Sequence, residues 1–137
     1  MVGASDGFPM TTPAGARVAC CGDPWVAEYA RRVRGMMETY ARGGRGRVFW
    51  LVPPVARQAA HVPIIGAVQA AITRASAGAA GVTVVRFDLL FTPHGYSDTI
   101  VYRGRLVRVR NVDGLHLSIE GQAIAAEVLA KLIRDQR

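Results

Sequence analysis

Hydrophobic residues follow two alternating patterns along this chain. Residues 24–42 and 62–79 place apolar side chains three or four positions apart, and so does the segment after Ser118, which predicts three amphipathic helices. Residues 48–52 and 82–87 are nearly continuous apolar runs, which are typical of strands buried on both faces of a parallel sheet. The alternation of helices with such runs predicts an α/β chain with a parallel sheet and right-handed crossovers.

Capping residues mark where two of these helices are expected to begin. We expect Asp23 to cap the first helix, because Pro24 follows at a position where proline starts helices well. We expect Ser118 to cap the last helix. Asp88 follows the second apolar run and therefore lies at the C-terminal end of a predicted strand, where parallel sheets collect the side chains that carry chemistry.

Glycine and proline divide the remainder into loops. Residues 7–23 are rich in both and predict a loop, and residues 92–111 look irregular. Within the second stretch, Arg103-Gly104 can turn a short hairpin. The opening residues, up to Val2, look like the end of a strand. The predicted order is therefore strand end, helix, strand, helix, strand, hairpin, helix.

Composition limits the class of protein. The chain has 137 residues, of which half are hydrophobic and a fifth are charged, which excludes a disordered protein and suits one domain over residues 1–137. The adjacent cysteines Cys20 and Cys21 are a poor pair for a structural disulfide. No apolar run approaches the roughly 18 to 20 residues of a membrane span, and the first residues do not form a signal peptide pattern. As written, the chain is expected to be soluble and cytoplasmic.

Positive charge dominates the chain, because seventeen lysines and arginines oppose ten aspartates and glutamates for a net charge of +7. The arginines form three groups, at residues 31–34, 42–47 and 103–110. We expect them on solvated faces, with helix ion pairs between Glu28 and Arg32 and between Arg34 and Glu38. No aromatic residues interleave with these groups as a stacking platform, so we do not expect nucleic acid binding.

The clearest chemical signal is the segment Asp113-Gly114-Leu115-His116. An aspartate and a histidine three residues apart on a tight loop can meet side chain to side chain. The carboxylate then accepts a hydrogen bond from imidazole Nδ1, which fixes the tautomer and leaves Nε2 free as a base. Asp113 and His116 are therefore the candidate catalytic residues, although the same spacing also suits a loop that Asp113 merely turns. No cofactor or metal is expected, because the chain lacks a glycine-rich phosphate loop and its histidines and cysteines lack metal-ligand spacing.

The segment Val112–Ser118, followed by Gly121, resembles the last conserved block of the SGNH (GDSL-type) hydrolases, a superfamily of lipases, esterases and carbohydrate acetyl-esterases. The resemblance implies that Asp113 and His116 are two members of a catalytic triad. The order of helices and strands upstream of this block also resembles the family, so that the resemblance covers nearly the whole chain.

The segment Gly3-Ala4-Ser5-Asp6 resembles a second block of the same family, Gly-x-Asn-Asp. In that block the asparagine donates a hydrogen bond to the oxyanion of the reaction. Ser5 stands at the position of the asparagine, which implies an auxiliary oxyanion donor that offers one hydroxyl.

The resemblance also implies a fold and a substrate class. The fold is a three-layer α/β/α sandwich with a parallel sheet, of the flavodoxin-like kind, and the substrate is an acyl or acetyl ester of a small molecule or carbohydrate. The family's first block, Gly-Asp-Ser with the nucleophilic serine, has no counterpart in this sequence. We therefore expect an N-terminally truncated domain, the C-terminal portion, that is weakly active or inactive alone. Its exposed sheet edge predicts self-association, and because the family is often exported, its compartment stays open.

Two alternatives remain open. Gly3-Ala4-Ser5-Asp6-Gly7 also spells Gly-x-Ser-x-Gly, the nucleophile elbow of α/β-hydrolases, with Ser5 as the nucleophile, His116 as the base and Asp88 or Asp113 as the acid. Only two residues precede this segment, and prolines follow it where an elbow needs a helix. In the other alternative, the chain is a non-catalytic domain that binds a partner through its arginines or its cleft.

Overall fold

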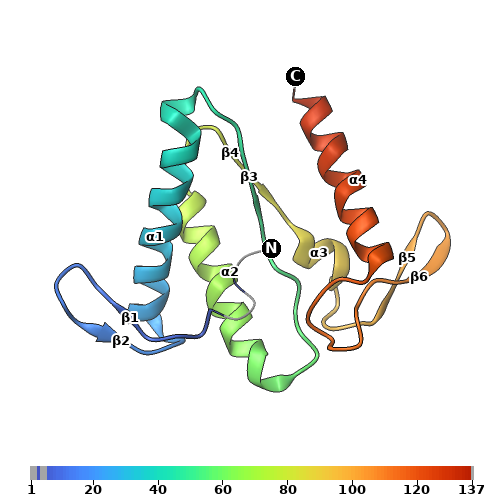
Figure 1. Ribbon diagram of the computed structural model, residues 1–137, viewed down its shortest axis with the longest axis horizontal. Coiled ribbons are helices and arrows are strands. Elements are labelled where there is room, and N and C mark those ends of the chain that lie inside the picture. The colour runs from blue at the N-terminus through green and yellow to red at the C-terminus, as the bar shows by residue number, and fades with distance from the viewer. Residues whose placement is uncertain (1–2, 4–5, 137) are drawn as a thin grey trace.

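The computed structural model describes residues 3 and 6–136 (Figure 1). Its helices are α1 (Asp23–Ala41), α2 (Val62–Ser76), α3 (Phe87–Phe91) and α4 (Ile119–Asp135), with 3-10 turns at Arg42–Gly44 and Ala59–His61. Its strands are β1 (Met10–Thr11), β2 (Arg17–Val18), β3 (Val48–Leu51), β4 (Val82–Val85), β5 (Thr99–Tyr102) and β6 (Arg105–Arg108). Within these residues, no helix is long and apolar enough to cross a membrane.

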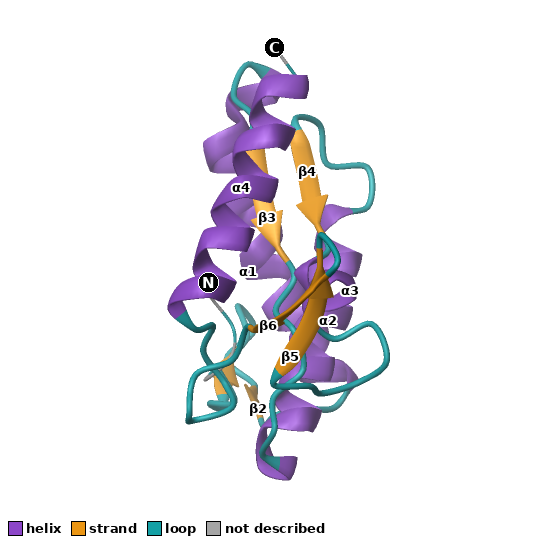
Figure 2. Ribbon diagram, turned by 90° about the vertical axis from the view of Figure 1, so that its right-hand side faces the viewer, coloured by secondary structure: helices purple, strands orange, loops and turns teal. Residues whose placement is uncertain are grey.

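A parallel pair of strands, β3 and β4, lies in the middle of the fold, with Val48 opposite Val82 and Leu51 opposite Val85. Helices α1 and α2 pack on one face of this pair and α4 on the other (Figures 1 and 2). The prediction of an α/β chain with a parallel sheet is confirmed at this coarse level. Among the described residues every sheet has two strands, so the three-layer flavodoxin-like sandwich stays a prediction. The expected strand end at Val2 lies outside the described residues.

The first apolar cluster packs α1 against α2 and one face of the parallel pair. Trp25, Met37 and Val68 are fully buried in it, and Trp50 and Val84 reach it from the strands. Helical spacing brings the apolar residues of each helix to one inner face. The helices predicted from the apolar period are therefore confirmed, with α2 ending at Ser76.

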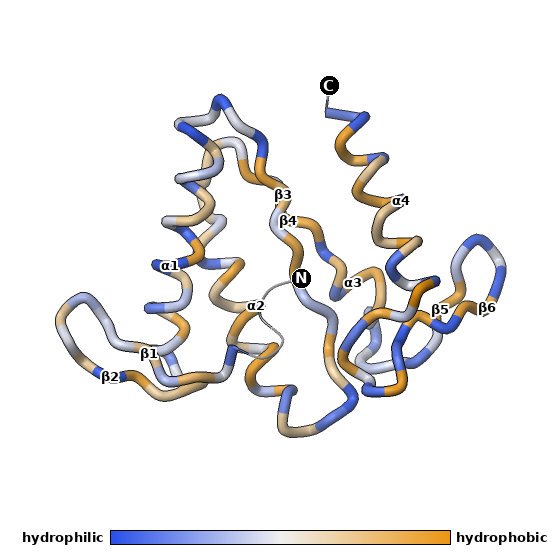
Figure 3. The backbone as a smooth tube through the Cα atoms, viewed as in Figure 1, coloured by the Kyte–Doolittle hydropathy of each residue, from blue (hydrophilic) through white to orange (hydrophobic). Residues whose placement is uncertain are grey.

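The second apolar cluster lies between the other face of the pair, the β5–β6 hairpin and α4. Phe91 and Val109 are fully buried there, and Phe49 and Leu51 of β3 pack against them. Figure 3 shows apolar and polar residues recurring in turn along α1 and α4, as helices with one buried face require. Consecutive residues of β3 thus face different clusters, because side chains alternate along a strand.

The hairpin turns, and the last helix begins, at the residues that the sequence predicts. The turn between β5 and β6 is Arg103-Gly104, both in the left-handed region at φ 51° and 76°, which hairpin turns of this length favour. Ser118 caps α4, and its Oγ accepts a hydrogen bond from the backbone N–H of Gly121 at 3.0 Å. Both predictions are confirmed.

Other boundaries differ from the predictions. The N-cap of α1 is Gly22, and Asp23 is the first helical residue, where its charge still suits the helix dipole. The glycine- and proline-rich stretch near the N-terminus contains the small antiparallel pair β1–β2. Cys20 and Cys21, which were not expected to bridge, are joined by a disulfide.

The second apolar run ends as a strand earlier than predicted. Strand β4 stops at Val85, and Phe87 begins the short helix α3. The carboxylate of Asp88 pairs with the Arg86 guanidinium at 2.6 Å, and the Asp88 carbonyl accepts from Thr92 N–H at 2.9 Å, which closes the turn. Asp88 therefore lies inside a helical turn and not at a strand end.

The predicted ion pairs of α1 are present, and in one of them the carboxylate is buried. Glu28 pairs with Arg32 and Arg34 with Glu38, each at 2.7 Å. Glu28 also binds Arg31, and its side chain is 3% exposed. Hydrogen bonds from Arg31 and Arg32 lower the pKa of Glu28 to about 2. This part of the first arginine group is therefore engaged with a buried carboxylate.

Candidate active site

The loop between β6 and α4 brings Asp113 and His116 together. Imidazole Nδ1 of His116 lies 2.7 Å from Oδ2 of Asp113. The other carboxylate oxygen accepts hydrogen bonds from the backbone N–H groups of Leu115 at 2.8 Å and His116 at 3.0 Å. The carboxylate is therefore positioned by two residues that follow it closely, Leu115 and His116.

These contacts set the charge of the pair. The hydrogen bond from His116, followed by those from the Leu115 and His116 amides, holds the pKa of Asp113 well below its usual range. An ionised Asp113 is an acceptor only, so Nδ1 of His116 is the donor in this contact and Nε2 points away from Asp113. The His116 side chain is 69% exposed, which leaves Nε2 open to a ligand. The pair can thus accept a proton at Nε2 and stabilise the resulting imidazolium.

A buried arginine supports the loop from below. Arg110 is fully buried, and its guanidinium donates to the carbonyls of Leu115 at 2.9 Å and Val55 at 2.6 Å. The arginines near the C-terminus were expected on a solvated face, and for Arg110 that expectation is wrong. The physical reason is that the loop turns its carbonyl groups inward, and a guanidinium can satisfy several of them at once.

Arg57 supports the loop from the side. Its backbone N–H donates to the Gly114 carbonyl at 3.0 Å, and its guanidinium donates to the Val112 carbonyl at 3.2 Å. The same guanidinium binds Asp98 at 2.8 Å and the Tyr96 hydroxyl at 3.2 Å. Sequence reasoning missed Arg57 and Arg110 as positioning residues. No local motif marks them, because each binds a backbone carbonyl 55 residues away, Val112 and Val55 respectively.

Two glycines allow these close approaches. Gly114 has φ 67°, and a Cβ there would lie 2.5 Å from Cβ of Arg57. A Cβ on Gly121 would overlap the carbonyl oxygen of Val109. The first turn of α4 can therefore rest directly on the backbone that follows β6, and this contact fixes the loop between them.

An apolar cavity of about 390 Å³ opens beside His116. Its other lining residues come from β3, α3, the loop and α4: Leu51, Phe87, Leu115, Leu117, Gln122, Ala125, Ala126 and Leu129. His116 and Gln122 are its polar members. A cavity with apolar walls and a base at its mouth can hold the hydrocarbon part of a substrate.

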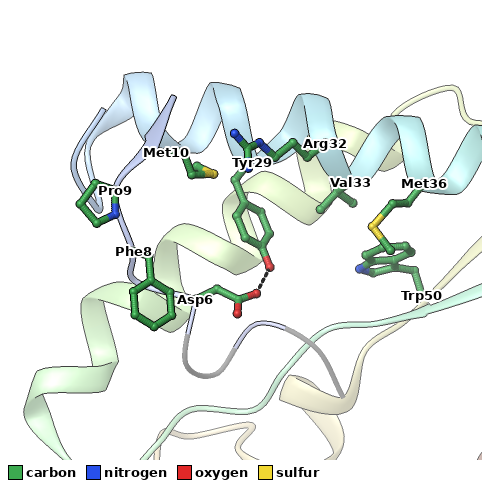
Figure 4. Close-up of a pocket in the computed structure, with 9 residues that line it drawn as sticks. All are labelled: Asp6, Phe8, Pro9, Met10, Tyr29, Arg32, Val33, Met36 and Trp50. Atoms are coloured by element: carbon green, nitrogen blue, oxygen red, sulfur yellow. Dashed lines mark hydrogen bonds between the residues drawn. The ribbon is translucent and has the colours of Figure 1, made fainter. Parts of the chain in front are cut away.

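The residues of the N-terminal block are placed in part. Ser5 lies outside the described residues. Its neighbour Asp6 accepts a hydrogen bond from the Tyr29 hydroxyl at 2.6 Å, at a cavity of about 330 Å³ beside α1 (Figure 4). Burial and this hydrogen bond raise the pKa of Tyr29 well above its usual range. Asp6 is thus held on α1, on the face of β3 that Trp50 occupies.

Of the two candidate acids, the structure brings Asp113 into contact with His116 and keeps Asp88 away from it. Asp113 binds the imidazole, whereas Asp88, the other candidate, is paired with Arg86. The hydroxyls of the described serines all make local hydrogen bonds, from Ser76 to Thr73, from Ser97 to Thr99 and from Ser118 to Arg108. In the part of the chain that the structure describes, no group of three or more His, Cys, Asp or Glu could hold a metal ion.

Comparison with known proteins gives a family without a described activity. The model of a family described as "Protein of unknown function (DUF459)" matches residues 1–132. No curated protein matches the chain.

Proposed function

Because the chain belongs to the DUF459 family of unknown function, we propose its activity from the Asp113–His116 loop: hydrolysis or transfer of an acyl ester, in an SGNH-type α/β/α domain. The observation that carries the proposal is the 2.7 Å contact between Asp113 Oδ2 and His116 Nδ1, which orients the imidazole and leaves Nε2 exposed. The substrate is a small-molecule or carbohydrate ester. The apolar cavity beside His116 supports a site for its acyl group.

His116 acts as general base and then as general acid. Nε2 takes the proton of the attacking hydroxyl as that oxygen bonds to the ester carbonyl carbon. The imidazolium then returns the proton to the leaving alkoxide as the carbon–oxygen bond breaks. Asp113 stays ionised and stabilises the imidazolium through Nδ1–H.

The attacking group is the open element of this proposal. For this chain alone, water activated by Nε2 can attack an activated ester, and Ser5 is an auxiliary oxyanion donor. In the alternative, Ser5 itself attacks and forms an acyl-enzyme. Labelling with a fluorophosphonate separates the two, because an adduct on Ser5 that disappears in His116→Ala requires the alternative.

Hydrolysis of p-nitrophenyl acetate tests the role of the pair. We expect His116→Ala to lower the rate about a hundredfold, because general acid–base catalysis is lost. Asp113→Asn should lower it as well, because the asparagine favours the wrong tautomer. The exposed His94, in the loop after α3, is the matched control, and His94→Ala should keep the wild-type rate. If wild type hydrolyses the ester faster than buffer alone, an equal rate for His116→Ala would contradict the proposal.

A further inference from the structure

The β5–β6 hairpin carries two apolar side chains on its outer face. Val101 and Leu106 lie opposite each other in the ladder. The residues that alternate with them pack against the second apolar cluster, namely Ile100, Tyr102 and Val107. Side chains alternate along a strand, so Val101 and Leu106 point away from that cluster. Antiparallel pairs ordinarily place polar residues on their solvated face, and so the packing of the hairpin does not explain these two apolar residues.

Two further apolar residues extend this exposed face toward the candidate active site. Val112 and Ile119 line a further cavity of about 390 Å³ together with Arg108, which follows Leu106 on the outer face of β6. The Ser118 hydroxyl donates to the Arg108 carbonyl at 2.8 Å, and this contact holds the start of α4 beside the end of β6. The four most exposed large apolar side chains of the described residues, between 73% and 82% exposed, therefore lie on neighbouring segments: Val101, Leu106, Val112 and Ile119.

Arginines accompany these apolar side chains. Residues 99–112 contain four arginines and no acidic residue. Three of the arginines are exposed, Arg103, Arg105 and Arg108. Arg103 pairs with Glu127 of α4, and the other two form no ion pair within the part of the chain that the structure describes. We call these three arginines and the four apolar residues the hairpin surface, which is both apolar and positively charged.

The composition of the hairpin surface favours a lipid surface as its partner. Three exposed arginines outnumber the one carboxylate that lines the cavity, Glu120, so the partner is anionic. Four aliphatic side chains gain free energy only in an apolar medium, which the acyl boundary of a bilayer supplies beneath its phosphates. A nucleic acid would pair with the arginines but would leave these side chains in water, and the hairpin surface has no aromatic ring on which bases stack.

The hairpin also has the position of a membrane-docking element. It projects from the side of the molecule, at the right of Figure 1, and faces the viewer in Figure 2. Its tip is the Arg103-Gly104 turn. Arginine side chains at such a tip can reach headgroup phosphates while the aliphatic side chains beside them enter the acyl boundary.

We propose that the hairpin surface docks on a bilayer that contains anionic phospholipids. Its arginines bind the lipid phosphates, and its four aliphatic side chains lie at the acyl boundary. Val112 directly precedes Asp113, so docking brings the candidate active site to the interface. The docking itself does not depend on the proposed ester hydrolysis.

Cosedimentation of the full chain with vesicles measures this binding. The vesicles contain equal parts of phosphatidylcholine and phosphatidylglycerol. We expect wild type to bind them, and to bind vesicles of phosphatidylcholine alone about tenfold more weakly, because the phosphatidylcholine headgroup has no net charge. Added salt should weaken the binding by screening the arginines. A wild type that does not bind the anionic vesicles overturns the proposal.

The double variant Arg105→Gln/Arg108→Gln tests the arginines. Each substitution should weaken binding about fivefold, which is the contribution of one arginine near an anionic surface. The matched control Arg45→Gln/Arg47→Gln removes the same net charge from the exposed turn between α1 and β3, and its binding should stay within about twofold of wild type. Equal losses for the two double variants would mean that only the net charge attracts the protein to lipid, and would overturn the proposal.

Leu106→Ser tests the apolar contact. It should weaken binding about fivefold, because less apolar area leaves water on docking. Tyr40→Ser, at another exposed apolar position, is the control and should bind like wild type. Both positions are exposed, so thermal unfolding should be unchanged. Wild-type binding by Leu106→Ser overturns the proposal, and displacement of that variant from the vesicles by a DNA duplex would then assign the arginines to nucleic acid.

Nitroxide-labelled lipids locate the contact in wild type without a variant. They should broaden the methyl signals of Val101, Leu106 and Ile119 in NMR spectra and leave that of Met36, on α1, sharp. Equal broadening of Met36 and Leu106 overturns the proposal. His116→Ala should bind vesicles like wild type, so a failure of the docking and a failure of the proposed ester hydrolysis are distinguishable.

Discussion

The two ends of the molecule are held together by different forces. Around α1 and α2, the interior is a cluster of fully buried apolar side chains such as Trp25, Met37 and Val68. Around the loop before α4, the largest fully buried side chains include Arg110, and the contacts that fix the loop are hydrogen bonds to backbone carbonyls. The first region is a scaffold, and the second holds a precise local geometry at the edge of solvent. Burial of apolar area stabilises the fold without fixing the positions of individual atoms, because it has no direction. Hydrogen bonds require defined distances and angles, and so they fix atomic positions.

The largest expected effect belongs to the scaffold. Trp25→Ala removes a fully buried ring that stacks on Tyr29 at 4.8 Å between centroids. It should lower the free energy of unfolding by about 3–5 kcal/mol. Urea unfolding measures this loss. Met36→Ala is the control on the same helix, because Met36 is 45% exposed, and its effect should be much smaller. Equal losses for the two variants would mean that α1 is not packed as described.

The next effect belongs to the loop. Arg110→Met keeps an unbranched side chain but leaves the carbonyls of Leu115 and Val55 without their donor, at a cost of about 2–3 kcal/mol. The exposed Arg105 gives the control Arg105→Met, for which we expect a change within about 0.5 kcal/mol. Arg110→Met should also lower ester hydrolysis by disordering the Asp113–His116 pair. If Arg110→Met were as stable as wild type, the hydrogen bonds of Arg110 would not be what holds the loop before α4.

Acid should affect the two regions differently. The folded pKa of Glu28, about 2, lies below its ordinary value of 4.5, so its carboxylate stabilises the fold above pH 5 and this contribution is lost as pH falls toward 2. The Asp113 carboxylate also stabilises the fold at neutral pH and loses this contribution in acid, because its folded pKa is lowered as well. Glu28→Gln should reduce the slope of global stability between pH 5 and 2. Asp113→Asn should also reduce this slope, and unlike Glu28→Gln it should accelerate exchange of the Leu115 and His116 amides.

The smallest effect belongs to an exposed ion pair. Glu38→Ala removes the partner of Arg34, whose other contacts to the Ala75 and Ala77 carbonyls remain. The expected loss is about 0.3–0.5 kcal/mol, and it should shrink further in high salt. Differential scanning calorimetry at two salt concentrations measures it. If Glu38→Ala lost as much stability as Arg110→Met, an exposed ion pair would contribute as much to the free energy of unfolding as the buried hydrogen bonds of Arg110.

The same contrast explains what the sequence could predict. The apolar period located α1, α2 and α4, because a helix that buries one face must repeat its apolar residues. The Asp-x-x-His spacing located Asp113 and His116, because their contact is local. The end of β4 was misplaced, since Phe87 continues the apolar run but packs from a helical turn.

The support of the candidate site could not be predicted. Arg57 and Arg110 bind carbonyls far from them along the chain, and a backbone carbonyl leaves no mark on the sequence. In composition they are two more arginines in a basic protein. Only the folded chain distinguishes them from their solvated neighbours.

The self-contained bonding of Asp113 has an evolutionary consequence. Its carboxylate is positioned by the backbone amides of Leu115 and His116, two and three residues further along the chain. It is also positioned by the His116 imidazole, which it orients in turn. Such a unit inherits its geometry with its own few residues and with Arg57 and Arg110, whose guanidinium groups bind its carbonyls. Substrate pockets, helix surfaces and neighbouring strands can diverge around it while the base keeps its direction. The loop can therefore pass unchanged between descendants that no longer share a substrate.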